Sequence, residues 1–292
     1  MIDRAQVKAM ISLMDDPDDA IYAQIKGQLL AMGPEVIPVL ENEWETTDYG
    51  LIFQTRIEKL IHEIQFNSVR MKLEVWIDNG ANDLLEGCMI INRYHYPDLD
   101  ESRVKKRIQQ MKHDIWLELN ENLTAFEQIR IINHILFDIY GLSANKKNFH
   151  APQNSYLNIV LDTGKGNPLS LSIIYSLICQ QLEIPVYGVN LPNHFVLAYM
   201  DRFNIIRIHE GKHEEVLFYI NPFSRGSIFN RKEIEQFLKQ LNVEPHESFF
   251  YPCNNLIIIK RMIANLVTAY EKSGSPEKGE ELTKLLSLFP VE

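Results

Sequence analysis

The feature that most constrains the fold is residues 164–199, where the hydrophobic pattern changes from helical to extended. Glycines mark a turn, an apolar segment typical of a buried helix follows, and this helix ends at Ile184-Pro185. The next runs, VYGV and HFVLAYM, have the β-branched and aromatic content of strands, and the second begins at His194. The segment therefore predicts a central helix followed by a sheet, with a histidine at the start of one strand.

The neighbouring segments extend this pattern. Upstream, DLLEGCMIINRY, ESRVKKRIQQMKHDIWLELN and TAFEQIRIINHILFDIYGL predict helices, the last opened by Thr124 and Glu127 as a capping box. Downstream, FNIIRI and EVLFYINPF have the composition of strands. We therefore expect a mostly helical α+β chain, in which a core over residues 69–245 packs a central helix on a small antiparallel sheet.

Helical modules are expected on both sides of this core. In residues 1–68, Asp16-Pro17 opens a helix that Gly33 closes, and further amphipathic helices follow, as in helical-repeat modules. Residues 246–292 contain two helical patterns separated by Ser275-Pro276. That size suits one unit of a tetratricopeptide-type repeat.

Composition limits the class of function. The chain has 292 residues, 46% of them hydrophobic, and a formal net charge of −10, which predicts a globular protein that does not bind nucleic acid. The N-terminus lacks the apolar run of a signal peptide, and no stretch approaches the ~18 apolar residues of a membrane span. Three cysteines at wide spacing suit reduced thiols. We expect a cytoplasmic protein without membrane contact.

Several ordered motifs support a family resemblance. Gly166 to Pro185, then His194, then YINPFSRG at 219–226 resemble the core of the transglutaminase-like superfamily, whose motif is Gly-x-Cys at a helix start, a strand histidine and an Asp-Pro. GNP before the helix, PNHF, NSYLNIVL and RMIANLVTAY resemble the SirB-type branch of bacterial proteins, which ends in a tetratricopeptide tail. The resemblance covers roughly residues 69–292, and it implies a papain-like core.

Carried over residue by residue, the resemblance indicates a lost thiol. The superfamily's cysteine falls on Pro168, its histidine on His194 and its aspartate on Asn221. Thiol catalysis needs a thiolate at the helix N-terminus and a histidine to exchange its proton. Pro168 supplies neither a nucleophile nor an acid, although proline suits a first helical position. Asn221 is a milder change, because an amide can still orient an imidazole.

Other nucleophiles are poorly placed for the same histidine. Cys179 would lie about 16 Å farther along the helix, among apolar residues, and is expected to be an inert core thiol. Ser170 and Ser172 lie closer to the helix start but point away from the direction of Pro168. Of the two, Ser170 is the better candidate nucleophile.

The remaining candidates are polar residues that the predicted topology brings toward His194. We expect a binding groove rather than a catalytic site, without a cofactor, and a protein or peptide as its partner. Turn and cap positions would account for part of this amide-rich set. Its members are Asn154, Asn158, Asn167, Ser170, His194, Asn221 and Arg225.

HEGKH, residues 209–213, matches the H-E-x-x-H pattern of zinc peptidases, which binds metal only when it is helical. Here it lies between two strand-like runs with Gly211-Lys212 as a turn signal, so we expect a hairpin tip. Three hypotheses therefore remain. They are a non-catalytic transglutaminase-like binding protein, which we favour, a hydrolase or transferase that uses Ser170 or an activated water with His194, and a zinc peptidase.

Overall fold

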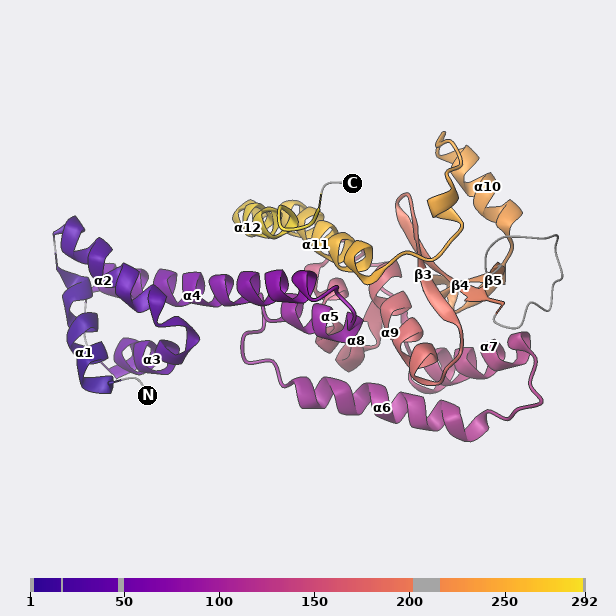
Figure 1. Ribbon diagram of the computed structural model, residues 1–292, viewed down its shortest axis with the longest axis horizontal. Helices are drawn as coiled ribbons and strands as arrows, with labels where there is room; N and C mark the ends of the chain where they lie inside the picture. The colour runs from indigo at the N-terminus through magenta and orange to yellow at the C-terminus, as the bar shows by residue number, and fades with distance from the viewer. Residues whose placement is uncertain (1–2, 17, 47–49, 202–215, 291–292) are drawn as a thin grey trace. The chain divides into compact units, whose positions relative to one another are not determined.

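The computed structural model describes residues 3–16, 18–46, 50–201 and 216–290, and its contacts divide the chain into two compact units (Figure 1). The first unit comprises residues 1–75 and 93–97, and the second comprises residues 76–92 and 98–292. The predicted strand FNIIRI and the HEGKH motif lie outside the described residues.

The first unit is helical. The carboxylate of Asp3 caps α1 by accepting from the backbone N–H groups of Ala5 and Gln6. Asp18, and not Asp16, caps α2, so this helix begins later than Asp16-Pro17 predicts. Gly33 follows the end of α2 with a φ of +68°, as its predicted closing position requires. The helices of this unit are α1 (Arg4–Ser12), α2 (Asp19–Ala31), α3 (Ile37–Thr46) and most of α4 (Leu51–Asp78), with 3₁₀ turns at Leu13–Asp15 and Gly33–Val36.

The apolar sides of these helices meet in a core of their own. Phe53, Ile57 and Leu60 recur at helical spacing along α4 and are fully buried. They pack with residues of the three shorter helices and the two 3₁₀ turns, among them Val7, Met14, Leu29, Val36 and Leu40.

The second unit combines helices with a four-stranded sheet. Its strands follow the order β3-β4-β5-β6 and are antiparallel throughout. A separate parallel pair joins β1 to β2. The strands are β1 (Ser143–Ala144), β2 (Lys165–Gly166), β3 (Val186–Leu191), β4 (His194–Met200), β5 (Val216–Asn221) and β6 (Ser227–Phe229).

The helices of the second unit include a π-helical turn, η3 (His134–Ile139), directly after α7. Thr124 and Glu127 form the predicted capping box at the start of α7. The α-helices are α5 (Leu84–Asn92), α6 (Glu101–Glu118), α7 (Ala125–Asn133), α8 (Leu157–Thr163), α9 (Pro168–Gln181), α10 (Arg231–Gln240), α11 (Asn255–Lys272) and α12 (Pro276–Leu286). Short 3₁₀ turns lie at η4 (Pro152–Ser155), η5 (Pro222–Ser224) and η6 (Glu247–Phe249).

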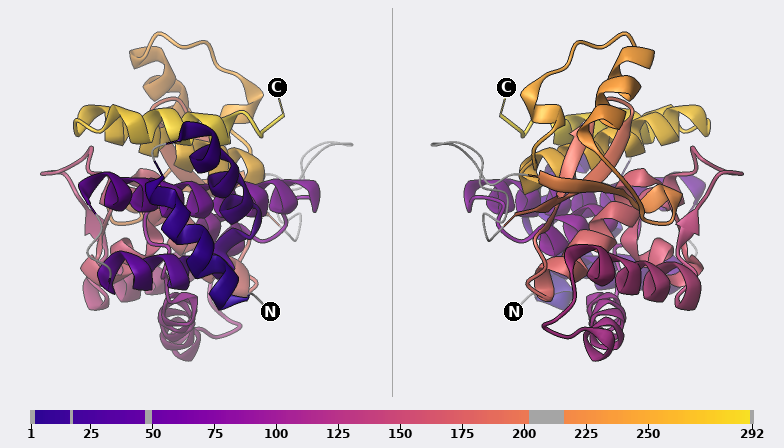
Figure 2. Two further views of the ribbon diagram at one scale, coloured as in Figure 1. Left: turned by 90° about the vertical axis from the view of Figure 1, so that its left-hand side faces the viewer. Right: turned by 90° about the vertical axis from the view of Figure 1, so that its right-hand side faces the viewer.

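Helix α9 is the centre of this unit. Every residue from Pro168 to Cys179 is buried, because β3 and β4 cover one side while α6, α8, α11 and η5 contact the others. Seen from the side of the sheet, the strands lie in front of the core helices (Figure 2, right). The buried surroundings explain why the sequence of α9 shows no polar face.

The opposite face of the sheet packs on α10, which the sequence analysis did not single out. Ile234 and Leu238 of α10 lie against Val189, Val196 and other inward residues of the strands. The sheet is therefore buried on both faces, and its strands are almost continuously apolar.

The C-terminal hairpin packs on the core. Helix α11 contacts α5, α9, β3 and η4, as well as its partner α12. The hydroxyl groups of Tyr156 and Tyr270 lie 3.0 Å apart, and Asn255 donates to the carbonyls of Ala81 and Asn82. Helix α11 is thus part of the second unit's core.

The predicted fold class is confirmed, since the chain is mostly helical with small sheets around a central helix. Among the described residues, none of the helices is long and apolar enough to span a membrane.

Candidate functional site

The start of α9 is fixed by a dense set of hydrogen bonds. The side chain of Asn167 accepts from the backbone N–H of Ser170, and the Ser170 hydroxyl accepts in turn from the backbone N–H of Asn167. Pro168 occupies the first helical position, where a missing N–H costs nothing. The Asn167 amide also donates to Ser155 at 2.9 Å, which ties α9 to η4.

His194 begins β4 and lines the same cavity as this helix start. It follows a tight turn in which Asn193 has a φ of +57°, a conformation that asparagine tolerates. The ring packs against Phe223 and Phe237, with centroid distances of 6.4 and 6.2 Å. The strand register and these two aromatic rings hold the imidazole in place.

The electrostatic surroundings keep His194 neutral. Burial lowers its pKa from 6.5, interaction with the Asn221 side chain opposes this shift, and the positive charge of Arg261 adds to it. Although Asn221 faces the ring, its Oδ1 atom is buried and has no hydrogen bond of good geometry to any described residue. The neighbourhood of His194 therefore contains a neutral imidazole and an unsatisfied amide oxygen.

A cavity of about 300 Å³ opens between these elements, and we call it the His194 cleft. Its walls come from the loop before η4, the start of α9, the β3–β4 turn and one face of α11. The lining residues are Phe149, His150, Ala151, Ser155, Asn167, Pro168, Leu169, Asn193, His194, Phe195, Arg261, Asn265, Thr268, Ala269 and Lys272.

The structure brings together part of the predicted set. Asn167 and His194 line the cleft with Pro168, and Asn221 lies directly beside the imidazole. The other predicted residues, Asn154, Asn158, Ser170 and Arg225, do not line the cleft.

Two of these residues support the backbone behind the cleft. The Asn154 amide donates to the carbonyls of Asn148 and Phe149 and accepts from Asn145, so all of it is used in shaping the preceding loop. The Ser170 hydroxyl is buried and donates to the Asn154 carbonyl at 2.6 Å. Asn158 contacts Asn92, at a distance of 3.1 Å. These contacts explain their residue types without a ligand.

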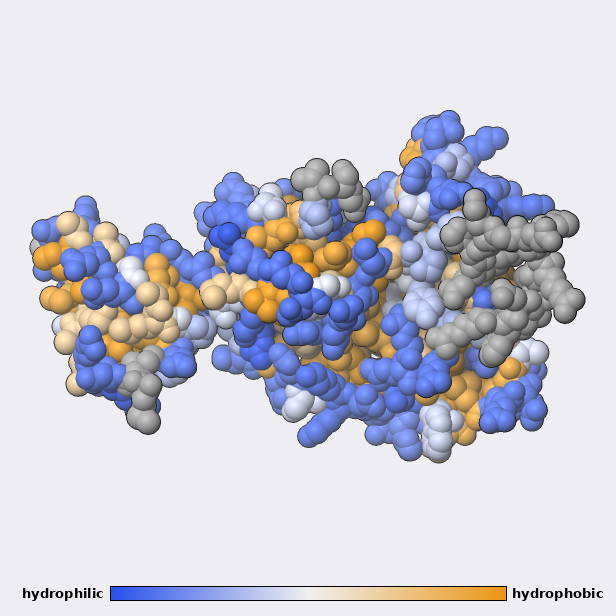
Figure 3. Space-filling view, viewed as in Figure 1, coloured by the Kyte–Doolittle hydropathy of each residue, from blue (hydrophilic) through white to orange (hydrophobic). Residues whose placement is uncertain are grey.

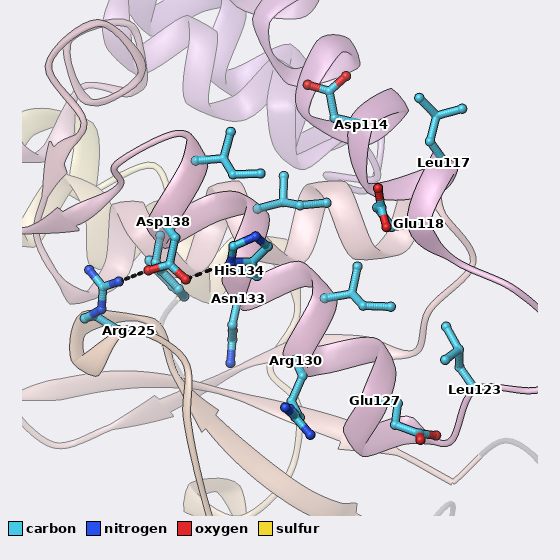
Figure 4. Close-up of a pocket in the computed structure, with 14 residues that line it drawn as sticks. Asp114, Leu117, Glu118, Leu123, Glu127, Arg130, Asn133, His134, Asp138 and Arg225 are labelled. Carbon is cyan, nitrogen blue, oxygen red and sulfur yellow. Dashed lines mark hydrogen bonds and ion pairs between the residues drawn. The ribbon is translucent and has the colours of Figure 1, made fainter.

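Arg225 lines a different hollow, the α6–α7 groove, of about 910 Å³. There its guanidinium pairs with Asp138, which also contacts His134 at 3.0 Å (Figure 4). In the space-filling view, hydrophobic surface lies in the region where Figure 1 draws α7 (Figure 3). In this larger groove three of the charged side chains, Asp138, Arg225 and Glu127, are already paired or used in capping.

Sequence reasoning missed the wall that α11 contributes. Arg261, Asn265, Thr268 and Lys272 recur at helical spacing and form a polar stripe along one face of α11. That periodicity was available in the sequence. The pairing of this stripe with His194 was not, because it depends on how the hairpin packs.

A family match agrees with this arrangement. The family described as "Transglutaminase-like superfamily" matches residues 102–264, which is more than half of the 292-residue chain. The chain belongs to the transglutaminase-like superfamily. The matched transglutaminase-like region runs from α6 into α11, and it contains Pro168, His194, Asn221 and Arg261.

Relatives of this transglutaminase-like chain occur in bacteria and in animals. A UPF0162 protein of Xylella fastidiosa is 27% identical over 223 residues, covering 73% of this chain and 74% of that protein. A UPF0162 protein of Buchnera aphidicola is also 27% identical, over 72% of this chain and 75% of its own length. F-box only protein 21 of mouse is 26% identical over 54% of this chain but only 24% of its own length. No solved structure matches the chain.

None of the three thiols of this superfamily member lines the cleft. Cys88 and Cys179 are buried, and burial raises the pKa of both. Cys253 is half-buried, and burial raises its pKa to about 12. Within the part of the chain that the structure describes, no cluster of three or more His, Cys, Asp or Glu side chains could hold a metal ion.

Proposed function

We propose that the transglutaminase-like core is a non-catalytic module that binds a protein or peptide in the His194 cleft. The observation that carries this proposal is Pro168, which stands at the start of α9 and in the cleft. In this proposal Pro168, His194 and Asn221 occupy the cysteine, histidine and aspartate positions of the superfamily, and the chain belongs to the SirB-type branch. A helix that begins with proline keeps the geometry of the fold but has no nucleophile at its first position.

None of the three cysteines lines this cleft, and the hydroxyl groups that do line it are those of Ser155, which accepts from Asn167, and Thr268. The raised pKa values of the cysteine thiols disfavour the thiolate at neutral pH. The Ser170 hydroxyl is used in the capping box and in a bond to Asn154. These facts favour recognition over covalent catalysis.

A modular role suits the rest of the chain. In this proposal residues 1–68 and the tetratricopeptide-like residues 246–292 flank the core 69–245, and the protein acts in the cytoplasm. The similarity to F-box only protein 21 spans only 24% of that longer protein, so a related segment there is one part of a larger chain. Helix α11 forms one wall of the cleft, which makes the hairpin part of the proposed site.

The test is capture of partners from a native lysate with the immobilised chain. We expect His194→Ala to reduce the amount of captured partner about tenfold while the melting temperature changes by only a few degrees. His134→Ala is the matched control, because His134 is an exposed histidine of the α6–α7 groove. Equal capture by wild type and His194→Ala would contradict the proposed site.

One observation supports the alternative of a hydrolase or transferase. Since burial lowers the pKa of His194, the imidazole is neutral at pH 7 and could accept a proton from a bound water. This alternative predicts turnover of a peptide or ester substrate that disappears in His194→Ala. The Ser170 version additionally predicts loss of turnover in Ser170→Ala with folding retained.

A further inference from the structure

The charged side chains that line the His194 cleft are all positive. The charged side chains in its lining are Arg261 and Lys272, and the other titratable ones are His150 and His194. The lining contains no aspartate or glutamate, although the chain has 39 acidic residues against 29 lysines and arginines. A cationic cleft in an acidic protein indicates an anionic ligand.

Arg261 is the central cation of this lining. It is half-buried on α11, where its Nη1 atom donates to Asn190 Oδ1 at 3.1 Å and to the Leu191 carbonyl at 3.3 Å. Among described residues, no carboxylate oxygen lies within 4.0 Å of this guanidinium. Charges removed from water are ordinarily paired, and the two neutral acceptors leave most of its five N–H donors available.

The neighbouring polar groups are also available to a ligand. The side chains of Asn265 and Thr268 lie one and two turns farther along the same face, and neither makes a hydrogen bond to another described residue. Lys272 Nζ lies 3.3 Å from His150 Nε2 at the exposed end of the stripe. The positive end of the 14-residue helix α9 opens into the cleft and adds potential of the same sign.

The rest of the lining is apolar. Phe149, Leu169, Phe195 and Ala269 give hydrophobic contact beside the cations. A cavity of about 300 Å³ is at the small end of ligand sites, which suits one or two residues of a peptide. One half-buried arginine matches the two oxygens of a carboxylate, whereas phosphate-binding sites more often use a cluster of arginines.

We infer that the His194 cleft binds a peptide carboxylate next to an apolar side chain, with Arg261 as the residue that pairs with the carboxylate. This inference rests on the proposed peptide-binding function and names the group that is recognised. The carboxylate can be the C-terminus of a chain or the side chain of an Asp or Glu, since both present the same two oxygens.

The test uses three pools of random tetrapeptides on the immobilised full chain, with bound peptide quantified by mass spectrometry. The first pool has a free C-terminal carboxylate, the second a C-terminal amide and no acidic residue, and the third a C-terminal amide and one fixed Glu. We expect retention of the first or the third pool at least about tenfold above the second. Preference for the first assigns a terminal carboxylate, and preference for the third assigns an acidic side chain.

Variants connect this preference to the cleft. Arg261→Gln should remove it, while Arg130→Gln, an arginine of the α6–α7 groove, should retain it. Because Arg261 also bonds to β3, a second variant, Lys272→Gln at the exposed rim, should weaken the preference about twofold to threefold without affecting folding.

The possible outcomes distinguish failure of this inference from failure of the proposed peptide-binding function. If all three pools are retained equally and His194→Ala releases them, the cleft binds peptides but recognises no carboxylate, and the inference is wrong. Retention of the acidic pools that Arg261→Gln and Lys272→Gln leave unchanged would also overturn it. If wild type retains no pool, the inference is wrong, and the capture experiment with His194→Ala decides the proposed function separately.

Discussion

At the scale of single residues, the site depends on a proline and a histidine. Pro168 starts α9 and supplies no nucleophile, and burial lowers the pKa of His194, which lies beside the Asn221 amide. In the proposed assignment these three residues occupy the cysteine, histidine and aspartate positions of the superfamily. Thiol catalysis would need changes at two of these three positions.

Substitution at the helix start tests this dependence. We expect Pro168→Cys alone to give no measurable transamidation, because Asn221 offers the imidazolium no carboxylate, and an amide in place of the triad carboxylate of a serine protease lowers kcat on the order of 10⁴. The double variant Pro168→Cys with Asn221→Asp should be the more active protein. Incorporation of a labelled amine into a glutamine peptide measures both, and strong activity of the single variant would show that an amide suffices.

The burial of His194 makes a prediction about pH. Its folded pKa lies below the unfolded value of about 6.5, so the unfolded state binds the proton more tightly. The neutral ring's contribution to stability is thus present above pH 6.5 and is lost as the pH falls toward the folded pKa. We expect His194→Gln to lose less stability than wild type between pH 7 and pH 5 in urea unfolding. Parallel pH profiles of the two proteins would contradict this account.

Gly226 shows how one backbone position supports the elements around the site. It has a φ of +71°, and an added Cβ would lie 1.9 Å from Asn133 Oδ1. Asn133 donates to the Gly226 carbonyl and accepts from Tyr175 of α9, so the turn after β5, α7 and α9 share one network.

Replacement of this glycine should therefore be costly. Gly226→Ala is expected to destabilise the protein by about 3 kcal/mol or more, from backbone strain and disruption of a buried network. Gly141→Ala is the control, because Gly141 has a φ of +70° with open space around its Cβ position and should cost only about 1–2 kcal/mol. Thermal unfolding measures both, and equal losses would show that the Asn133 network contributes nothing.

At the scale of elements, the sequence was informative where a pattern is local. The apolar run of α9, the β-rich runs of β3 and β4 and the capping box of Thr124 depend on neighbours in sequence, and all three form as predicted. The position of His194 at the first residue of β4 follows from the same local pattern.

Other features depend on contacts between distant segments. Arg225 follows β5 as expected, yet its pairing with Asp138 of η3 turns it into the α6–α7 groove. Asn154 lies near α9, but its side-chain amide donates to backbone carbonyls of the preceding loop. Arg261 enters the cleft only because α11 packs beside β3, which no local pattern indicates. The sequence therefore predicted the frame of the cleft and only part of its lining.

The packing of α11 gives a prediction for the hairpin. Deleting residues 246–292 removes buried Ile259, Met262, Ile263 and Leu266 and one wall of the cleft. Each large buried side chain contributes about 2–5 kcal/mol on truncation, so these four together contribute about as much as the whole stability of a typical domain. We expect the second unit to lose its cooperative unfolding transition in calorimetry. A truncated chain with an unchanged transition would show that the hairpin is independent of the core.

At the scale of the whole molecule, the chain combines a helical first unit with a transglutaminase-like second unit. In the proposed function, the second unit recognises a peptide and does not change it. Binding and turnover would both take place in the His194 cleft, so the amount of bound peptide and its chemical change can be measured in one sample.

The most direct test follows the fate of bound peptide. Peptides retained by the wild-type chain are eluted after a long incubation and weighed by mass spectrometry beside the His194→Ala variant. The account predicts that wild type retains more peptide than the variant and returns it with unchanged mass. Products of hydrolysis or amide exchange that accumulate with time in wild type, and are absent with His194→Ala, would contradict it and establish an enzyme.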